Sequence, residues 1–306
     1  MGSNTVDFSI VIVNMNAKDW LQLCLRGAME GHDGVTSQII LIDNASVDGS
    51  VEAARQTCPD IVALPQATNL GYVPANNIGL GHATGDLVMF LNNDAMLQPG
   101  SLAHLKAFMA ARPDVGAVSG QILNPDGSDQ GCARNFPSVA NGLFGRRSLL
   151  TRAFPNNPWS KKFMVGRHQD TDAPFEVEIL SSACLVVRTD LAKQLGGMDE
   201  SFGLYWVDAE MCARIRKLGY KVYCVPDAKI VHDEGQGGST KTFRQRVKAT
   251  ISFHRDAYLA YTKVNDWSAL HPLRLFAATA LTARAALLMG MQLLRPGRAT
   301  SSGGKN

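Results

Sequence analysis

Three short, almost uninterrupted apolar runs limit the fold of this chain more than any other feature. They are Phe8–Val13 (FSIVIV), Gln38–Ile42 (QIILI) and Leu87–Leu91 (LVMFL), and helical patterns lie between them. A strand without polar alternation has to be covered on both faces, as in a parallel sheet between layers of helices. The alternation of strands and helices, from residue 8 to about 120, therefore predicts an α/β fold with a doubly wound first half.

The second half of the chain is less regular. Residues 124–174 are rich in Gly, Pro and Asn without a sustained period, so we expect long loops and short helices there. Regular patterns return beyond them and predict a strand-like stretch at Phe175–Arg188, a helix at Asp208–Leu218, and two strands at Lys221–Val225 and Ala228–His232. The chain beyond Thr242 has a helical pattern.

Polar side chains follow each of the three apolar runs at once. They are Asn14 and Asn16 after the first, Asp43 and Asn44 after the second, and Asn92, Asn93 and Asp94 after the third. Ligands of an open parallel sheet bind beyond the carboxyl ends of its strands, where these side chains are expected to meet. Asp and Asn are also common turn formers, but three such strand ends in sequence make a turn-only explanation less favourable.

The net charge of +3 hides an uneven distribution. Residues 131–169 hold seven Lys and Arg and no acid, and residues 235–306 hold eleven Lys and Arg and two acids, so the rest of the chain is strongly acidic. An acidic half beside two basic segments suits a metal-using site next to a surface for an anionic partner. The alternative is an ordinary solvated surface.

The cysteine pattern and the N-terminus both favour a cytoplasmic protein. The six cysteines are scattered among apolar neighbours without metal-ligand spacing, which is typical of reduced core cysteines. The first residues lack a basic segment followed by a long apolar one, so no signal peptide is predicted.

Five segments together resemble a known family. In chain order they are Val11–Asn16 (VIVNMN), Asp43–Ser50 (DNASVDGS), Asn69–Gly79 (NLGYVPANNIG), Leu91–Ala95 (LNNDA) and Gly197–Arg214 (GMDESFGLYWVDAEMCAR). The chain resembles glycosyltransferase family 2 over residues 6–240, and within it the bacterial rhamnosyltransferase-type enzymes of cell-surface polysaccharide synthesis. The resemblance implies a GT-A fold, which is a Rossmann-like, mostly parallel sheet with helices on both faces.

The same resemblance implies a domain organisation. Residues 1–240 would form the GT-A domain, with a nucleotide-sugar-binding half at 1–120 and an acceptor and catalytic half at 121–240. Residues 241–306 would form a helical tail.

The family's donor site can be transferred onto matching residues. The resemblance makes Asp43 and the loop Asn14–Asn16 the nucleobase-recognising element, since a carboxylate can accept the imide N–H of uracil or thymine. A dTDP- or UDP-linked sugar is therefore favoured as the donor. Further donor-binding residues implied by the resemblance are Asn44, Ser46, Asn69, Gly71, Asn77, Asn92 and Asn93.

The resemblance also implies a divalent metal, Mg²⁺ or Mn²⁺. Asp94 resembles the last carboxylate of the family's Asp-x-Asp motif, and His232 resembles its third metal contact. Hard cations prefer oxygen ligands and often share them with substrate phosphates. Asn92 stands in place of the first Asp, so we expect modest metal affinity. Without this context, His232 could equally be a polar residue that ends a strand.

Asp208 matches the family's catalytic base, and the implied reaction is a single displacement that inverts the anomeric centre. A placed carboxylate can take the proton of an attacking hydroxyl. Val207 and Glu210 replace the Glu and second Asp of the family's Glu-Asp-x-Asp run. An acid in the first turn of a helix is also favoured by the helix dipole, which would explain Asp208 without catalysis.

The acceptor is expected at the basic stretch 131–169, which is interleaved with five aromatic residues. That composition suits a glycan or polyprenyl-diphosphate-linked acceptor. Nucleic acid could use the same residue types, but nothing else in the chain supports it.

The apolar run Leu273–Leu294 contains Arg274 and Arg284, which favour a helix in the membrane interface at the inner face of the cell membrane over a spanning one. Packing on the domain or on another subunit, and hence a homo-oligomer, is the alternative.

Two other functions stay open. A sugar-phosphate nucleotidyltransferase shares the sheet topology but needs a Gly-rich, basic phosphate loop after the first strand, and Asn14-Met15-Asn16 is not one. A catalytically inactive subunit that binds sugar nucleotides would accommodate the substitutions at Asn92 and Val207. The sequence does not identify the sugar, and it leaves the nucleobase open between uracil, thymine and guanine.

Overall fold

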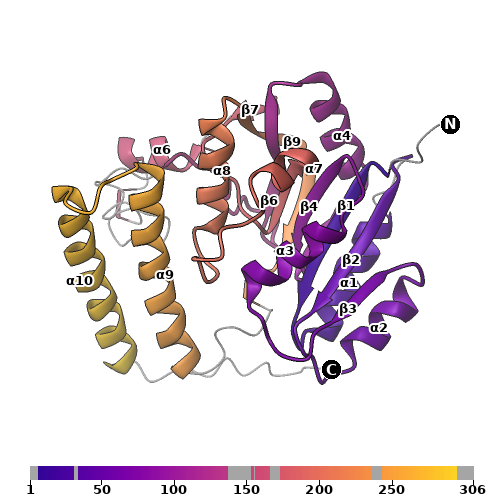
Figure 1. The fold of residues 1–306 in the computed structure, drawn as a ribbon, viewed down its shortest axis with the longest axis horizontal. Helices are drawn as coiled ribbons and strands as arrows, with labels where there is room; N and C mark the ends of the chain where they lie inside the picture. The colour runs from indigo at the N-terminus through magenta and orange to yellow at the C-terminus, as the bar shows by residue number, and fades with distance from the viewer. Residues whose placement is uncertain are drawn as a thin grey trace.

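The computed structural model of the protein describes residues 6–30, 34–136, 153–154, 156–165, 173–235 and 243–294. One sheet forms its centre, with nine strands among the described residues in the order β3-β2-β1-β4-β8-β6-β9-β5, and with β7 paired to β9. Helices cover both faces of this sheet, and two long helices lie beside it (Figure 1). The predicted α/β class is confirmed.

The first half of the sheet is parallel. Its strands are β1 (Phe8–Asn14), β2 (Ser37–Asp43), β3 (Val62–Pro65) and β4 (Leu87–Asn92), and its helices are α1 (Lys18–Glu30), α2 (Ser50–Thr57) and α3 (Tyr72–His82). β1, β2 and β4 are the three predicted strands. Sequence reasoning missed β3, a four-residue strand at the edge of the sheet that buries none of its residues fully.

The second half of the sheet is mixed. Its strands are β5 (Ala95–Leu97), β6 (Val115–Leu123), β7 (Phe175–Glu176), β8 (Cys184–Arg188) and β9 (Lys221–His232), and its helices are α4 (Ser101–Ala111), α6 (Pro158–Phe163), α7 (Thr189–Gln194) and α8 (Val207–Lys217). β8 runs antiparallel between β4 and β6, whereas β6 and β9 are parallel. The helix predicted at Asp208–Leu218 corresponds to α8.

Two strand predictions need correction. The expected strand-like stretch Phe175–Arg188 is two strands, because the intervening backbone leaves the sheet to pair at Ile179 with Arg134. The two strands expected on either side of Pro226 are the single strand β9. Proline cannot donate to a ladder. The pairing with β6 therefore shifts register between Gly120 and Gln121, while β9 continues beyond the irregularity.

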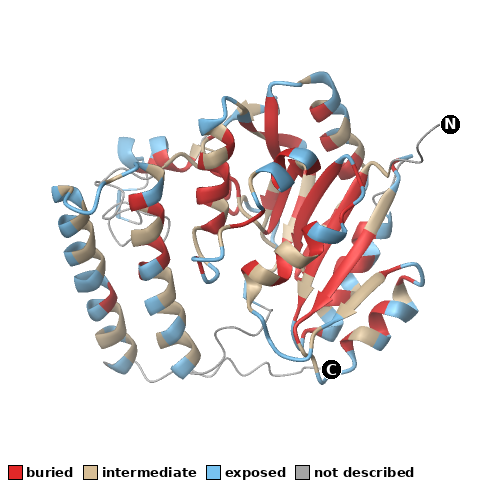
Figure 2. Cartoon of the chain, viewed as in Figure 1, coloured by how far each residue is buried: buried red, intermediate tan, exposed pale blue. Residues whose placement is uncertain are grey.

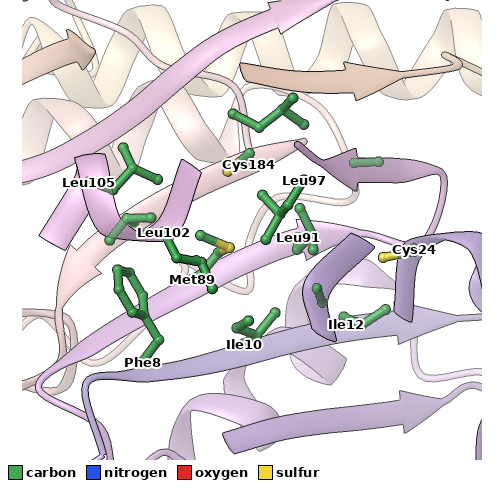
Figure 3. Close-up of a cluster of buried hydrophobic side chains, with 14 of the residues drawn as sticks. Phe8, Ile10, Ile12, Cys24, Met89, Leu91, Leu97, Leu102, Leu105 and Cys184 are labelled. Carbon is green, nitrogen blue, oxygen red and sulfur yellow. The ribbon is translucent and has the colours of Figure 1, made fainter. Parts of the chain in front are cut away.

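The strands are buried on both faces, as the apolar runs require (Figure 2). Alternate residues of β1 point into two cores. Phe8, Ile10 and Ile12 pack with α1, α2 and α4, and Figure 3 shows part of this cluster. Val11 packs on the opposite face with α3, α7 and α8. Each fully buried side chain of this kind contributes about 1.5–3 kcal/mol. All six cysteines are buried thiols outside any disulfide, as predicted.

The described part of the chain closes with an antiparallel helical hairpin of α9 (Phe243–Val264) and α10 (Pro272–Leu294). α9 buries Ala257 and Ala260 against the α/β body, whereas α10 contacts α9 and is otherwise largely exposed (Figures 1 and 2). Over Pro272–Leu293, α10 is long and apolar enough to cross a membrane by length and composition. The predicted domain boundary at residue 240 stays a prediction, although α9 packs directly on α8.

Candidate active site

The polar strand ends of β1, β2 and β4 do meet at one edge of the sheet. The parallel register pairs Asn14 with Asp43 and Val13 with Asn92, so the last residues of the three strands lie side by side. Asn14 and Asp43 are almost completely buried, at 1% and 2% exposure. Buried polar groups of this kind have to be hydrogen-bonded, and their bonds define the site.

Asp43 is the centre of the first cluster. Its Oδ1 accepts hydrogen bonds from Asn14 Nδ2 at 3.1 Å and Ser46 Oγ at 2.6 Å, and its Oδ2 accepts one from the Ser46 backbone at 2.9 Å. Ser46 Oγ also accepts from the Asn16 backbone at 2.8 Å. Asn93 donates to Asn14 Oδ1 at 2.8 Å. The ends of β1, β2 and β4 are thereby locked to one another.

A second group of predicted donor residues lies on the loop before α3. Asn44 donates to the Gly71 carbonyl at 3.1 Å, and Gly71 donates to Asn69 Oδ1 at 2.8 Å. Asn69 itself is exposed and contacts the Met15 sulfur. This loop therefore lies beside the Asp43 cluster, with the Asn69 side chain open to solvent.

Asn77 lies elsewhere, on the face of α3 that meets α7. Its side chain donates to the Met198 carbonyl at 2.9 Å and to Glu200 Oε1 at 3.1 Å, and it accepts from the Met198 backbone at 2.8 Å. These bonds hold the segment after α7 in place. The predicted donor contact of Asn77 stays a prediction, and the structure gives this residue a structural role.

Three residues beside this edge have positive φ without being glycine. They are Asn16 at 50°, Ala45 at 59° and Trp206 at 64°. Such backbone costs of order 1–3 kcal/mol per residue unless the surroundings hold it, and it concentrates at functional sites. Asn16 and Ala45 shape the loops around Asp43, and Trp206 immediately precedes α8.

Asp94 and His232 meet where β5 pairs with the end of β9. The antiparallel register aligns Ala95 with His232, and the Asp233 backbone donates to the Asp94 carbonyl at 3.1 Å. The Asp94 Oδ1 and His232 Nε2 atoms are 3.1 Å apart, and both residues are buried. The two predicted metal ligands are thus neighbours although they lie far apart in sequence.

Gln130, which sequence reasoning missed, fixes the orientation of the His232 ring. Its Nε2 donates to the His232 carbonyl at 2.5 Å, so its Oε1 is the atom that faces His232 Nδ1 at 2.9 Å. An amide oxygen can only accept, so Nδ1 carries the proton. In the neutral ring, Nε2 then presents a lone pair to the Asp94 carboxylate. At 3.1 Å from Asp94 Oδ1, Nε2 can either carry a second proton and donate to the carboxylate or join it in coordinating a cation.

This donor set fits a divalent metal that is completed by a substrate. Among the described residues, no group of three or more His, Cys, Asp or Glu is placed to hold a metal. One carboxylate and one imidazole leave most positions for diphosphate oxygens and water, which is how Mg²⁺ is commonly held. Asn92 Nδ2 lies 3.4 Å from His232 Nε2, so its amide borders the same space.

Asp208, the predicted base, lies in the first turn of α8 and is partly exposed. Its Oδ2 accepts from the Ser182 backbone at 3.3 Å, and its Oδ1 from the Ala209 backbone at 2.8 Å. Tyr72, another residue that was missed, links Asp208 to the Asp94–His232 pair. The Tyr72 hydroxyl lies 3.3 Å from both Asn92 Oδ1 and the Ser182 carbonyl.

Tyr72 remains a neutral donor in this position. Burial, together with the nearby charges of Asp208 and Asp94, raises the pKa of Tyr72 to about 12. The hydroxyl can therefore donate its proton to Asn92 Oδ1 or to the Ser182 carbonyl at neutral pH. The hydroxyl connects the end of β4 to the loop that orients the Asp208 carboxylate.

Glu210, two residues after Asp208, is turned into the protein. Burial raises the pKa of Glu210, although the guanidinium of Arg214 lies 2.7 Å from its Oε1. Its Oε2 has no hydrogen-bond partner. Val207 is completely buried. Of the two residues that depart from the family's motif, Val207 is therefore a core side chain and Glu210 is a buried acid. Asp208 is the acid of this turn that stays partly exposed.

Most of the predicted acceptor stretch 131–169 lies outside the described residues. Within its described part, Phe154 and Trp159 are 62% and 48% exposed, whereas Phe163 is buried. A separate open hollow of about 450 Å³ lies at the far end of α8, beside Arg216 and Lys217. Both cations are ion-paired, so we assign no ligand to this hollow.

Comparisons with known proteins identify the family of this chain. Residues 9–164 match the model of the family described as Glycosyl transferase family 2. The N-acetylglucosaminyl-diphospho-decaprenol L-rhamnosyltransferase of Mycobacterium tuberculosis (strain ATCC 25618 / H37Rv) is 32% identical over 273 residues, covering 85% of this chain and 86% of the relative. The dTDP-rhamnosyl transferase RfbF of Shigella flexneri is 24% identical over 170 residues, covering 55% of this chain and 50% of that protein.

Solved structures show the same fold. Mannosyltransferase PcManGT from Pyrobaculum calidifontis, in complex with GDP-Man and Mn²⁺, superposes with a TM-score of 0.55 at 20% identity, over 97% of this chain and 82% of that one. GalNAc-T7 with UDP, GalNAc and Mn²⁺ superposes with a TM-score of 0.58 at 15% identity, over 95% and 58%.

The sheet and these neighbours define a GT-A glycosyltransferase fold. The chain belongs to glycosyltransferase family 2. Both predictions are confirmed, and with them the broad activity of a glycosyl transferase.

Proposed function

We propose that the chain is an inverting glycosyltransferase that moves a hexosyl or deoxyhexosyl group, rhamnosyl-like in character, from a nucleotide-diphosphate sugar to a hydroxyl. The observation that carries the proposal is the geometry of one sheet edge. The Asp94–His232 pair, with its acceptor atoms 3.1 Å apart, is linked through Asn92 and Tyr72 to the partly exposed Asp208. A cation site beside an available carboxylate suits transfer from a diphosphate donor.

The nucleobase binds at the Asp43 cluster in this proposal. Asp43 Oδ2 accepts one hydrogen bond from the chain, so a carboxylate lone pair is left for an imide N–H. That chemistry favours uracil or thymine. The names of two relatives, a dTDP-rhamnosyl transferase and an L-rhamnosyltransferase, support a deoxyhexosyl donor.

Asp208 acts as the general base. Its carboxylate takes the proton of the acceptor hydroxyl while that oxygen forms a bond to the anomeric carbon. In the same step the bond between this carbon and the diphosphate oxygen breaks, and the nucleoside diphosphate leaves with the electron pair. One displacement from the opposite side inverts the anomeric configuration. General-base assistance of this kind typically contributes about 10²–10⁴-fold.

Asp94 and His232 would hold the divalent metal, and Asn92 and Gln130 would support them. Mn²⁺ or Mg²⁺ bound there would supply positive charge to stabilise the departing diphosphate. Because Asn92 replaces a carboxylate, the protein's own affinity for the metal would be modest, and the donor diphosphate would supply further oxygen ligands.

The acceptor is a glycan or a polyprenyl-diphosphate-linked sugar, as the decaprenol-linked acceptor in the name of the Mycobacterium tuberculosis relative supports. The outer face of α10 then contacts the membrane interface on the cytoplasmic side. Leu275, Leu287 and Leu293 are 75%, 65% and 66% exposed there. The two arginines of α10 contact Tyr258 and His254 of α9, so the membrane contact rests on the exposed apolar side chains of the outer face.

The proposal is tested with a panel of nucleotide sugars, each supplied with Mn²⁺ or Mg²⁺, with and without a chelator. We expect release of nucleoside diphosphate from one donor, dependent on the metal, and faster when a lipid-linked acceptor is present. An inverted anomeric centre in the product, seen by NMR, would support the single displacement. A retained configuration would contradict it.

The same panel separates the proposal from an inactive subunit. Donor binding by calorimetry without turnover, even with lipid-linked acceptors, would favour a subunit that only binds sugar nucleotides. The membrane contact is tested by sedimentation with anionic and neutral vesicles. We expect binding to anionic vesicles that is lost in Leu275→Glu, and no binding by the unchanged protein would contradict this contact.

A further inference from the structure

A buried carboxylate outside the predicted site, that of Asp256, binds the backbone of the loop that precedes α8 and the candidate base Asp208. Asp256, in the middle of α9, is completely buried. Its Oδ2 accepts from three successive backbone N–H groups, those of Gly203, Leu204 and Tyr205, at 3.1, 3.3 and 3.2 Å. Ser252 Oγ adds a fourth bond at 3.3 Å. A buried charge needs this degree of pairing, so the loop and α9 depend on each other.

The loop approaches α9 closely at Gly203. A Cβ atom added to Gly203 would lie 3.1 Å from Ser252 Oγ and 3.4 Å from Asp256 Oδ2. Neighbouring cations of α9 hold the start of the same loop. Arg255 donates to the Ser201 carbonyl at 2.9 Å, and Lys263 donates to Ser201 Oγ at 3.0 Å. The segment 201–205 is therefore tied to one helix along its whole length.

The loop ends at Trp206, whose backbone is held in the left-handed region. Trp206 has φ 64° and ψ −2° and is the N-cap residue of α8, without a side-chain cap hydrogen bond. Its ring packs against Phe253 and Tyr261, both on α9, with ring centroids 5.7 and 6.1 Å apart. A bulky residue persists in this conformation only when its surroundings impose it. α9 supplies those surroundings.

Asp208 follows two residues later. Because α8 has no side-chain cap of its own, the start of α8 takes its position from the preceding loop. We infer that Asp256 is a positioning residue for the reaction, and that α9 belongs to the catalytic machinery rather than to an appended tail. Its carboxylate fixes residues 203–205, which fix Trp206 and hence the Asp208 carboxylate. The inference rests on the proposed role of Asp208 as base.

The test is a double-mutant cycle in the full-length protein. Asp256→Asn keeps the shape but replaces the carboxylate by a weaker, neutral acceptor for the three N–H groups and removes the oxygen that accepts from Arg255. Turnover should therefore fall roughly ten- to hundred-fold, as for a catalytic group misplaced by about 1 Å. The affinity for the donor, measured by calorimetry, should stay unchanged. Asp266→Asn is the matched control, since it removes only the exposed pair with Lys217 beyond the end of α9. It should leave turnover unchanged.

The second half of the cycle repeats Asp256→Asn in an Asp208→Asn background. If Asp256 acts through Asp208, the added substitution should change the remaining turnover by less than about two-fold, because coupled residues are not additive. An equal loss in both backgrounds would overturn the inference, and so would an unchanged turnover in Asp256→Asn alone. If Asp208→Asn itself keeps full activity, the proposed function fails instead.

A second variant covers the case in which Asp256→Asn does not fold. Phe253→Leu leaves the hydrogen bonds of Asp256 in place and removes the ring contacts with Tyr205 and Trp206, together with the contacts of the ring to His254 and Arg284. It should lower turnover, by less than Asp256→Asn, with donor affinity unchanged and with the same loss of effect in the Asp208→Asn background. Unchanged turnover in folded Phe253→Leu would contradict the inference.

Discussion

The carboxyl-end edge of the parallel strands and the loop before α8 hold their functional side chains by different means. At this edge of the sheet, Asn14, Asp43 and Asn93 lie at the ends of parallel strands and bond to one another. Before α8, the backbone is held by Asp256, about fifty residues further along the chain and on another element. The first site is a product of strand register. The second depends on tertiary contacts, so it should respond to changes far from the chemistry.

The largest effect is expected at the metal pair. Asp94→Asn removes the carboxylate of the proposed metal pair, in which His232 is the other member. Mutating a residue that only hydrogen-bonds to a metal ligand typically lowers metal affinity by about 10–100-fold. Replacing a ligand itself should lower the affinity by at least as much. We expect Mn²⁺ binding in the presence of nucleoside diphosphate, followed by calorimetry, to be lost. Unchanged Mn²⁺ affinity would remove Asp94 from the metal site.

A smaller effect is expected at Gln130, which orients the His232 ring. Gln130→Leu removes the acceptor for Nδ1–H, and the Mn²⁺ affinity should fall by about 10–100-fold. Gln130→Glu is the control, since its carboxylate can still accept from Nδ1, and it should lose less. Equal losses in the two variants would show that ring orientation is not what Gln130 provides.

A matched pair of glycines in α3 tests how tightly the donor half is packed. A Cβ atom added to Gly79 would lie 2.3 Å from Val11 Cγ1, whereas one added to Gly81 has no atom within 4 Å. Gly79→Ala should therefore lower the free energy of unfolding by about 1–3 kcal/mol. Gly81→Ala should raise it by about 0.5–1 kcal/mol. Urea denaturation measures both, and equal effects would contradict tight packing of α3 on β1.

The smallest effect concerns pH and the contact between Asp199 and Lys263. Partial burial acts to raise the pKa of Asp199, but the hydrogen bonds from Lys263 and Ser201 outweigh it and hold that pKa below its usual value. The contact therefore stabilises the folded protein above the unfolded pKa of about 3.9 and is lost as the pH falls through the lower folded value.

The Asp199→Asn variant should accordingly be less stable at pH 7 by at most about 1 kcal/mol, because the pair is partly exposed. The difference from the unchanged protein should shrink as the pH falls below about 4, where the carboxylate is protonated in both states. Thermal denaturation at several pH values measures this. A difference that persists at low pH would show that the pair acts by packing rather than by charge.

The same difference between the two regions explains which parts of the structure the sequence predicted. Apolar runs and the polar residues after them predicted β1, β2 and β4 and brought Asn14, Asp43 and Asn92 together, because parallel register needs only strand ends. Strand β3 was missed because four half-buried residues leave a weak pattern. The single strand β9 was divided because Pro226 signals a break that a register shift absorbs.

The supporting residues could not be predicted for a different reason. Gln130 contacts His232 and Tyr72 contacts Ser182 across more than a hundred residues. Gln130 lies in no segment with a chemical signal, and Tyr72 lies within Asn69–Gly79 but no role was predicted for its side chain. In the sequence, Asp256 is one polar residue in a helical segment rich in Lys and Arg, and nothing there indicates a role for it. Only the fold shows that its carboxylate faces three backbone N–H groups. Asn77 carried a family signal but proves to be bound to Met198 and Glu200.

The most direct test of the account is turnover and donor binding in Asp208→Asn, measured beside the unchanged protein with saturating metal and acceptor. Turnover should fall by about 10²–10⁴-fold with donor affinity unchanged, because only the proton acceptor is lost. Turnover within about two-fold of the unchanged protein would contradict the role of Asp208 as base.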